Sequence, residues 1–320
     1  MPNSIGICTG IFNNFSQMYN PANIVKMTFQ HKRTSRIPKG ELWLGTELFK
    51  ILNINDDIKG HFEIVRLLGQ DIISFPLSNE RSMHPILKYR YFNLKEISEA
   101  SKINEDLFLI VVLDGPFQRI SERLGFLKVL SYINRERSKM IREFDKEFSK
   151  IDILIERCLE FSINAFVLCD DLAGENNIIL NPEVFFEIFS QFYKSIIFKI
   201  HQKGAYLLFH SCGKIISLIS QLISIGFDGF AAIQDRPNDL VSIKKRFGKS
   251  VTLMAGIDSE ILDKEGYSLL ILREFEERLK QLTTGGGFIL CSSTGLYSGD
   301  FLRRVKEIYK IVEGFKRNDF

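Results

Sequence analysis

Several features that would define other classes of protein are missing from the 320-residue sequence. No stretch reaches the ~18 consecutive apolar residues that a membrane-spanning helix needs. Residues 1–20 do not combine a basic start with an apolar run, as a secretion signal does. The five cysteines are an odd number and lie far apart, which is not typical of a disulfide framework. We therefore expect a protein of the reducing cytoplasm with no membrane partner.

The sequence also has little excess charge of one sign. It contains 42 Lys and Arg against 39 Asp and Glu, which gives a formal net charge of +3. Basic and acidic residues are mixed, as in residues 135–150, and this pattern indicates solvated helix faces rather than a basic patch. We therefore expect no nucleic-acid partner. The hydrophobic fraction of 45% is ordinary for a globular protein and allows a large core.

No linker rich in Pro, Gly or Ser divides the chain. Instead, a short apolar run followed by a longer helical pattern recurs, as is typical of parallel strands covered on both faces. The eight runs are Glu41 to Gly45, Asp71 to Pro76, Phe108 to Asp114, Ala165 to Asp171, Ala205 to His210, Phe227 to Ile233, Val251 to Ile257 and Gly287 to Cys291. We expect an amino-terminal extension over residues 1–24 and one domain over residues 25–316.

The fingerprints of open nucleotide-binding sheets are absent. No G-x-G-x-x-G follows the first run, and no G-x-x-x-x-G-K-[ST] occurs. Helices between the runs have boundary signals: Asn181, Pro182 and Glu183 form a helix start, and Gly204 allows a left-handed end. Eight repeats of strand and helix therefore favour an α/β fold of the closed (β/α)8 type, a TIM barrel, with reactive groups at the carboxyl ends of its strands.

Polar residues end most of the predicted strands. His210 and Cys212 are the pair most suggestive of chemistry, because residues i and i+2 of an extended chain point the same way. Imidazole nitrogen and thiolate sulfur are preferred zinc ligands, and Cys291 at the end of the last strand is the candidate for a third ligand. Three protein ligands would leave one position open, as in catalytic zinc sites. The alternative is a packed core cysteine beside a histidine that faces solvent.

Carboxylates also end strands. Asp170 and Asp171 are adjacent and are candidates for a general acid or base or for a substrate contact; the alternative is that they cap a following loop or helix. Asp258 is a further catalytic candidate, and Asp114 is a candidate for substrate binding, with the same alternative. Four other histidines have no partner at ligand spacing, and we assign them no role: His31, His61, His84 and His201.

Taken together, these segments resemble the uroporphyrinogen decarboxylase superfamily over residues 25–315. The resemblance depends on the order and spacing of short motifs. They are Arg36 to Gly45, Leu68 to Asp71, Asp114 to Phe117 with Gly125 and Phe126, Asp170 to Leu172, Asn181 to Glu183, His210 to Lys214, Gly226 to Asp228, Gly256 to Asp258 and Gly285 to Leu290. The superfamily has two main chemistries, decarboxylation of a porphyrinogen and methyl transfer that involves a corrinoid.

The chain is more similar to the methyltransferase branch. The arginine-rich motif of the decarboxylases is missing from residues 31–43, and their Asn-Leu-Gly-His-Gly pattern is missing from residues 285–299. The methyltransferases have a zinc site of His-x-Cys plus a distant Cys, which His210 and Cys212 match. The distant Cys would fall at position 294, which is Thr294 here, whereas Cys291 lies three residues earlier.

The resemblance implies a mechanism. Zinc held by His210, Cys212 and Cys291 would bind a thiol or pterin acceptor, which takes a methyl group from methylcobalamin carried on a separate corrinoid protein. Asp114, Gln234 and Tyr297 are the expected substrate contacts. Two alternatives stay open. One is decarboxylation of a polyacid, with Arg33, Arg36, Arg119 and Arg123 as possible anion contacts; the other is a catalytically reduced barrel that only docks a corrinoid protein.

Overall fold

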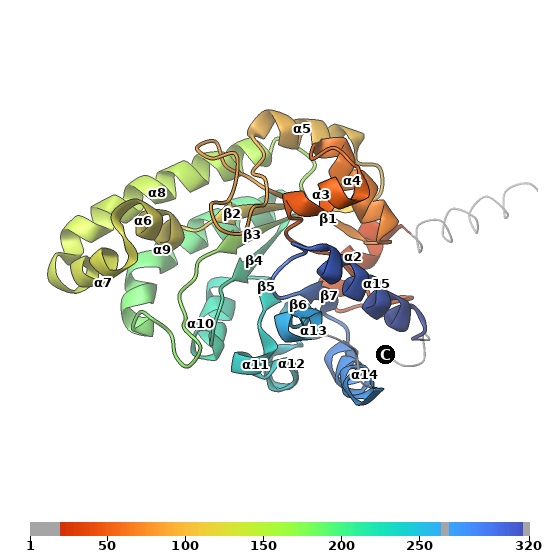
Figure 1. Cartoon of the computed structure of the whole chain (residues 1–320). Coiled ribbons are helices and arrows are strands. Elements are labelled where there is room, and N and C mark those ends of the chain that lie inside the picture. Colours follow the sequence, from red (N-terminus) through yellow and green to blue (C-terminus); the bar gives the residue numbers. More distant parts are fainter. Residues whose placement is uncertain (1–19, 264–268, 316–320) are drawn as a thin grey trace, which may run out of the picture.

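Strands and helices alternate along the chain. The computed structural model describes residues 20–263 and 269–315. Its strands are β1 (Ile72–Pro76), β2 (Phe108–Asp114), β3 (Ala165–Cys169), β4 (Tyr206–His210), β5 (Gly229–Ile233), β6 (Thr252–Ile257) and β7 (Phe288–Ser292). All are parallel and pair in chain order, so that they form one curled sheet with helices around it (Figure 1). Each corresponds to one of the last seven predicted strands.

The helices surround this sheet. They are α2 (Pro21–Phe29), α3 (Thr46–Leu52), α4 (Ile58–Leu67), α5 (Leu94–Ile103), α6 (Pro116–Leu124), α7 (Phe126–Arg135), α8 (Arg137–Cys158), α9 (Pro182–Gln202), α10 (Ile216–Ile225), α11 (Asp235–Asn238), α12 (Leu240–Phe247), α13 (Ser259–Asp263), α14 (Leu269–Thr283) and α15 (Gly299–Glu313). The predicted start of α9 is confirmed, since the Asn181 side chain accepts a hydrogen bond from the Glu183 N–H. Within the described ranges, no helix is long and apolar enough to cross a membrane.

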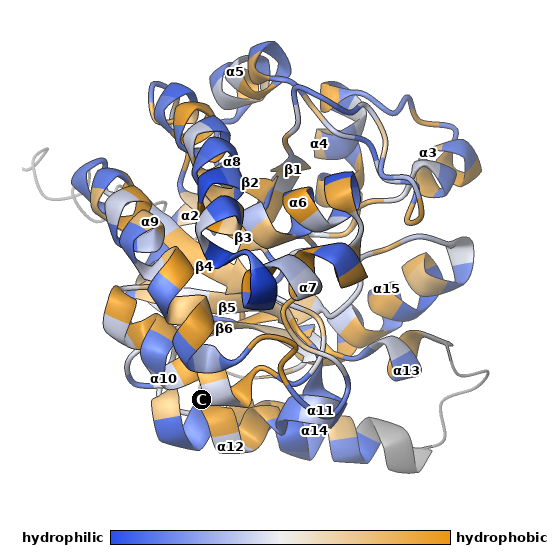
Figure 2. Ribbon diagram, turned by 90° about the vertical axis from the view of Figure 1, so that its left-hand side faces the viewer, coloured by the Kyte–Doolittle hydropathy of each residue, from blue (hydrophilic) through white to orange (hydrophobic). Residues whose placement is uncertain are grey.

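Alternate residues of each strand belong to two separate cores. In β2, Phe108, Ile110 and Val112 face the inside of the curled sheet, whereas Leu109 and Val111 pack against the helices. The strands are therefore apolar on both sides, and the helices around them turn hydrophilic faces outward (Figure 2). This pattern explains why the strands appear in the sequence as nearly continuous apolar runs.

Helix α2 closes the amino end of the curled sheet. The ring of Phe29 stacks on the rings of Phe108 and Tyr206, which are the first residues of β2 and β4. Residues 21–24, expected in an extension, are thus part of this helix. The remaining part of the expected extension, residues 1–19, lies outside the described residues and includes Cys8. Because α2 covers the inside of the sheet at its amino end, a cavity inside the sheet is expected to open at the carboxyl ends of the strands.

The prediction of a first strand from Glu41 to Gly45 was wrong. This segment runs between β7 and β1 but makes only isolated bridges, so an eighth regular strand is not formed there. The physical reason is that a side chain replaces part of the expected ladder. The hydroxyl of Ser74 in β1 lies 2.8 Å from the carbonyl oxygen of Glu41 and 2.7 Å from that of Leu42. Its single proton is shared between these two carbonyls, which a strand would pair with backbone N–H groups.

Two buried carboxylates hold this irregular segment. Asp71, at the start of β1, pairs with the Arg36 guanidinium and accepts a hydrogen bond of 3.0 Å from the Lys39 N–H. Glu41 accepts hydrogen bonds from the Tyr309 hydroxyl of α15, at 2.8 Å, and from the N–H and hydroxyl of Ser292 in β7. The segment is therefore fixed to the sheet edge and to a covering helix by side chains.

The burial of Glu41 should make stability depend on pH. Burial raises the pKa of Glu41 from 4.5 to about 7, so the folded protein favours the protonated carboxyl more than the unfolded chain does. This contribution to stability is fully present below about pH 4.5 and is lost as the pH rises through about 7. We expect the free energy of unfolding to fall by about 3 kcal/mol from this group between those limits.

The measurement is urea denaturation at a series of pH values, with Glu41→Gln as the matched variant. Glutamine does not titrate, so the unfolding free energy of the variant should decline less steeply between pH 5 and pH 8 than that of the wild type. Equal slopes for the two proteins would contradict the prediction.

Candidate metal centre

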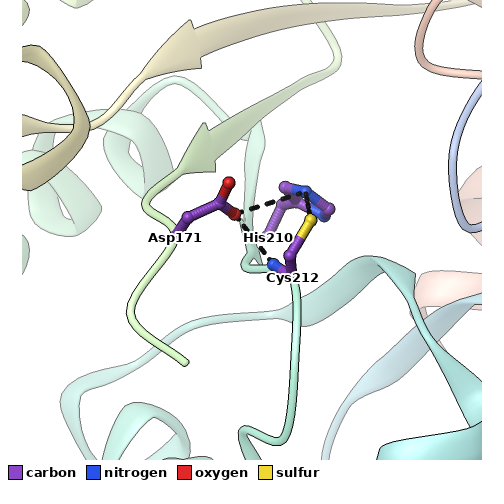
Figure 3. A group of neighbouring side chains, drawn as sticks. All are labelled: Asp171, His210 and Cys212. Atoms are coloured by element: carbon purple, nitrogen blue, oxygen red, sulfur yellow. Dashed lines mark hydrogen bonds and ion pairs between the residues drawn. The ribbon is translucent and has the colours of Figure 1, made fainter. Parts of the chain in front are cut away.

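Two predicted ligands come together at the carboxyl end of β4. His210 is the last residue of the strand, and Cys212 follows in the loop. As expected for residues i and i+2, both side chains point to the same side, and the Cys212 Sγ lies 4.0 Å from the His210 Nε2 (Figure 3). The imidazole is buried, whereas Cys212 is half-buried. The pair is therefore supported by the sheet on one side and accessible on the other.

The neighbouring strand orients the imidazole. His210 Nδ1 lies 2.9 Å from the carbonyl oxygen of Ala231 in β5, which has to accept the Nδ1 proton. This contact leaves the lone pair of Nε2 free on the side of Cys212. The carbonyl lies at a bulge, where the register shifts between Ala231 and Ile233 and where Ala232 has a φ of 52°. A left-handed backbone is uncommon for alanine, so β5 is locally strained at this contact.

Asp171 is the third potential donor. It follows β3, and its Oδ1 accepts a hydrogen bond of 2.8 Å from the Cys212 N–H and lies 4.0 Å from the His210 Nε2 (Figure 3). The candidate ligand atoms of Asp171, His210 and Cys212 all lie within 4.8 Å of one another. Sequence reasoning had named Asp171 as a catalytic residue and not as a ligand.

Cys291 does not join this group within the described residues. Its side chain does point to the inside of the sheet, as predicted, but the sulfur lies 3.2 Å from the carbonyl oxygen of Ser292 and 3.9 Å from a carboxyl oxygen of Glu41. The strand β7 is three strands away from β4 in the sheet, and Cys291 is fully buried in its wall. The structure therefore does not bring Cys291 to His210 and Cys212, and the third potential donor beside them among the described residues is Asp171.

The donor set fits a zinc ion. One nitrogen, one sulfur and one carboxylate oxygen are all zinc ligands, and atoms bound to tetrahedral zinc lie about 3.3 to 3.8 Å apart, close to the 4.0 Å separations here. Hard cations such as Mg²⁺ prefer oxygen donors only. Without a cation, burial raises the pKa of the Cys212 thiol to about 12. A bound cation would reverse this preference, since a coordinating thiol is deprotonated.

Asp170 lies on the opposite side of the chain from Asp171. Its carboxylate is fully buried and accepts hydrogen bonds from the Gln118 N–H, at 2.9 Å, and from the Tyr193 hydroxyl, at 3.0 Å. It thereby caps the first turn of α6, whose N-cap residue, Gly115, provides no side chain. A Cβ at Gly115 would lie 2.2 Å from the Asp170 Cγ, which explains the glycine. This placement matches the alternative in which Asp170 is a cap.

A cavity of about 310 Å³ opens over the three donors. Its described lining combines aromatic, polar and acidic side chains from several strand ends and loops. The lining residues are Trp43, His84, Leu87, Tyr89, Asp114, Gln118, Cys169, Asp171, His210, Cys212, Gln234, Ser259, Ser293, Thr294, Tyr297 and Phe301. Two of the predicted metal ligands, His210 and Cys212, thus line this cavity at the carboxyl ends of the strands, where the fold was expected to hold reactive groups, whereas Cys291 does not.

The three predicted substrate contacts all line this cavity. Asp114 ends β2, and its Oδ2 accepts hydrogen bonds from Arg81, at 2.6 Å, and from the Tyr91 hydroxyl, at 2.9 Å. The Gln234 Oε1 accepts a hydrogen bond of 2.8 Å from the Gly213 N–H. The Tyr297 hydroxyl is buried with no hydrogen-bond partner among the described residues, so it is available to a ligand.

Asp258, the remaining catalytic candidate, lies outside this lining. Its carboxylate accepts hydrogen bonds from the Ser293 hydroxyl, at 2.9 Å, and from the N–H groups of Ser259 and Arg236. It lines a neighbouring cavity, which shares Cys212, Gln234 and Ser259 with the first. Asp258 thus fixes the loop that follows β6 beside the metal centre.

None of the four arginines considered as anion contacts lines the cavity. Arg36 pairs with Asp71, Arg119 with Glu147 and Glu80, and Arg123 with Glu143. Arg33 lines a different cavity, at the amino end of β7. The described wall of the cavity at the metal centre therefore has no guanidinium for a polycarboxylate.

Sequence reasoning missed the aromatic side of the cavity. His84 and Tyr89 come from the segment between β1 and α5, and Trp43 from the irregular segment beside β7. The ring of Trp43 lies 6.2 Å from that of Tyr89 and 5.1 Å from the imidazole of His210, measured between centroids. The available signal was the position of Tyr89 and Tyr91 in the segment that follows β1, since the loops after barrel strands carry ligand contacts.

Comparison with known proteins identifies the family. The sequence profile of uroporphyrinogen decarboxylase (URO-D) matches residues 79–315, which is well over half of the chain. The chain therefore belongs to the uroporphyrinogen decarboxylase family, as its motifs predicted. No curated protein matches the sequence significantly.

Solved structures share the fold at low sequence identity. A methyltransferase from Methanosarcina mazei superposes with a TM-score of 0.71 and 13% identity, over 92% of this chain and 98% of that one. A putative vitamin-B12-independent methionine synthase from Listeria monocytogenes gives a TM-score of 0.53 and 11% identity, over 86% and 95%. A B12-independent methionine synthase from Shewanella sp. W3-18-1 gives 0.52 and 12%, over 87% and 93%. These similarities establish the α/β fold of the family.

Proposed function

We propose that the protein is a zinc-dependent methyltransferase that moves a methyl group between a corrinoid protein and a small thiol or pterin. The observation that carries this proposal is the convergence of Asp171, His210 and Cys212 in a cavity at the carboxyl ends of the strands. Membership of the family and the similarity in fold to a methyltransferase support it.

Zinc would be held by the His210 Nε2, the Cys212 Sγ and an Asp171 carboxylate oxygen. When bound, it would lower the pKa of a thiol acceptor so that the acceptor is a thiolate at neutral pH. The protein's own residues prepare the site. Ala231 fixes the imidazole through its carbonyl group, and the Cys212 N–H fixes the Asp171 carboxylate.

The cavity would orient the acceptor and exclude water. Trp43 and Tyr89 supply an apolar wall beside His210, and the unpartnered Tyr297 hydroxyl is a candidate hydrogen-bonding group for the substrate. Holding a nucleophile in line with a methyl group is the main contribution that a protein can make to such a displacement. The methyl donor would be methylcobalamin on a separate corrinoid protein, which docks over the open side of the cavity.

The test combines metal analysis with methyl transfer. We expect purified protein to contain about one zinc per chain and to convert methylcobalamin to cob(I)alamin in the presence of a thiol, with matching formation of the methyl thioether. Removal of the metal with a chelator should abolish the reaction, and added zinc should restore it. Zinc below about half an equivalent together with no thioether from any thiol or pterin would contradict the proposal.

Decarboxylation of a porphyrinogen is less well supported. Such a substrate carries several carboxylates, and the described lining of the cavity contains no Lys or Arg to bind them. Capture of a corrinoid protein without any methyl transfer would instead favour the catalytically reduced barrel.

A further inference from the structure

The cavity at the metal centre is acidic, although the chain as a whole is slightly basic. Its described lining contains the carboxyl groups of Asp114 and Asp171 and no Lys or Arg. In the proposed function the charges of Asp171 and of a Cys212 thiolate would neutralise zinc, so the carboxyl group left for the far end of a ligand is that of Asp114. Burial lowers the pKa of His84, which therefore favours the neutral form. Lys88 lies between the lining residues Leu87 and Tyr89 in the sequence, but its ammonium group donates to the Pro85 carbonyl and is not part of the lining. A ligand in this cavity meets negative charge without a lysine or arginine.

The arginines around the cavity are already paired with acids. Arg81 contacts both Asp114 and Glu122, so this trio has a net negative charge when both acids are ionised. Burial raises the pKa of Asp114, and the Arg81 guanidinium opposes that rise. Arg236 lines the neighbouring cavity and pairs with Glu260, and Glu175 and Asp258 are in the same lining. The charge of each arginine is therefore matched or exceeded by nearby carboxylates.

The cavity at the metal centre is also lined by aromatic rings. Trp43, Tyr89 and Tyr297 all line the cavity, and the faces of such rings attract cations. The buried Tyr297 hydroxyl can accept a hydrogen bond from an ammonium group. The Trp43 Nε1–H is also buried without a partner and can only donate, but one neutral N–H stabilises an anion much less than a guanidinium does.

From these features, and on the basis of the proposed methyl transfer, we infer that the acceptor is a small thiol whose far end carries a positive charge, such as a protonated amine. The sulfur would lie at the metal centre and the ammonium between the aromatic rings and the carboxylates. An acceptor with a sulfonate or carboxylate end would meet a carboxyl group and, in the described lining, only neutral donors such as the Trp43 Nε1–H. The same features therefore select against acidic thiols.

Methyl transfer from methylcobalamin to such a thiol would be a displacement at the methyl carbon. The thiol loses its proton to solvent, and the sulfur electron pair forms the new carbon–sulfur bond. The cobalt–carbon bond of methylcobalamin breaks with its electron pair remaining on cobalt, which is reduced from Co(III) to Co(I). The charged end of the thiol takes no part in these steps, so its preference arises from binding in the cavity.

Three thiols with the same two-carbon chain test the inference: cysteamine, mercaptoethanol and mercaptoethanesulfonate. With methylcobalamin as donor, kcat/KM should decrease in that order, by at least about tenfold between the first and the last. An ammonium group also makes the thiol more acidic, so kinetics alone do not isolate binding. Calorimetric titration of the corresponding S-methyl thioethers, which have no thiol proton, removes this effect and needs no turnover.

A pair of neighbouring residues gives the matched variants. Leu87 lines the cavity and is 44% exposed, whereas Ile86 is 80% exposed and is not in the lining. Leu87→Arg should shift the ratio of sulfonate to ammonium thioether affinity by about tenfold in favour of the sulfonate. Ile86→Arg should change this ratio little, because its charge lies in solvent.

The outcomes separate the two hypotheses. If no thiol is methylated but the ammonium thioether binds most tightly, the proposed methyl transfer fails and the charge preference stands. If thiols are methylated and the sulfonate is used or bound as well as the ammonium compound, methyl transfer stands and the inference is overturned. Absence of measurable binding by the ammonium thioether would also overturn it.

Discussion

Cys212→Ala is expected to lower the zinc content of the purified protein from about one equivalent to below about 0.1, and methyl transfer by at least about 100-fold. The physical reason is that the remaining donors, His210 and Asp171, are a nitrogen and an oxygen that bind zinc weakly as a pair. Metal analysis by mass spectrometry and the methylcobalamin assay give the two readouts.

Cys158→Ala is the matched control. Cys158 is also a free cysteine, but it is fully buried and ends α8 in the core between the sheet and the helices. Loss of its sulfur should lower the free energy of unfolding by about 1 kcal/mol and leave the zinc content unchanged. Equal zinc content in both variants would show that Cys212 is not a ligand and would remove the basis of the proposed function.

Replacing the adjacent residues Asp170 and Asp171 by alanine should affect two different properties, stability for Asp170 and zinc binding for Asp171. Asp170→Ala leaves the Gln118 N–H and the Tyr193 hydroxyl buried without their acceptor, and should lower the free energy of unfolding by about 3 kcal/mol. Asp171→Ala removes a half-exposed side chain, and should instead weaken zinc binding by roughly 10- to 100-fold with little loss of stability.

Urea denaturation of the metal-free proteins and zinc titration measure the two effects separately. Tyr193→Phe provides a control for Asp170, because it removes one of the two hydrogen bonds and should cost about 1 kcal/mol. A large loss of zinc affinity in Asp170→Ala, with no loss of stability, would show that the assignment of the two carboxylates is reversed.

Most of the fold could be predicted because the strands are buried on both faces. A strand such as β2 is apolar at every position before its last residue, Asp114, and a run of that kind is visible in the sequence whatever its neighbours are. The segment from Glu41 to Gly45 could not be distinguished in this way. Its composition fits a strand, but two of its carbonyls bond to the hydroxyl of Ser74, and no local pattern reveals a partner 32 or 33 residues away.

The candidate site was predictable where the chemistry lies within one strand end. His210 and Cys212 are two residues apart, so the backbone alone decides that their side chains point the same way. A third ligand from another strand depends on how far each strand extends and where its loop turns. Asp171 reaches the pair because the Cys212 N–H holds its carboxylate, whereas Cys291 stays in the wall of the sheet beside Glu41.

The bulge in β5 links the folding of one strand to the chemistry of another. Ala232 holds a left-handed backbone at φ 52°, which costs on the order of 1 kcal/mol for a residue with a Cβ. The Ala231 carbonyl beside it is the group that aims the imidazole of His210. β5, which contributes none of the three donors, is thus strained at the contact that fixes the angle of the His210 ring. The geometry of the candidate metal centre therefore depends on the main chain of β5 as well as on the donor side chains.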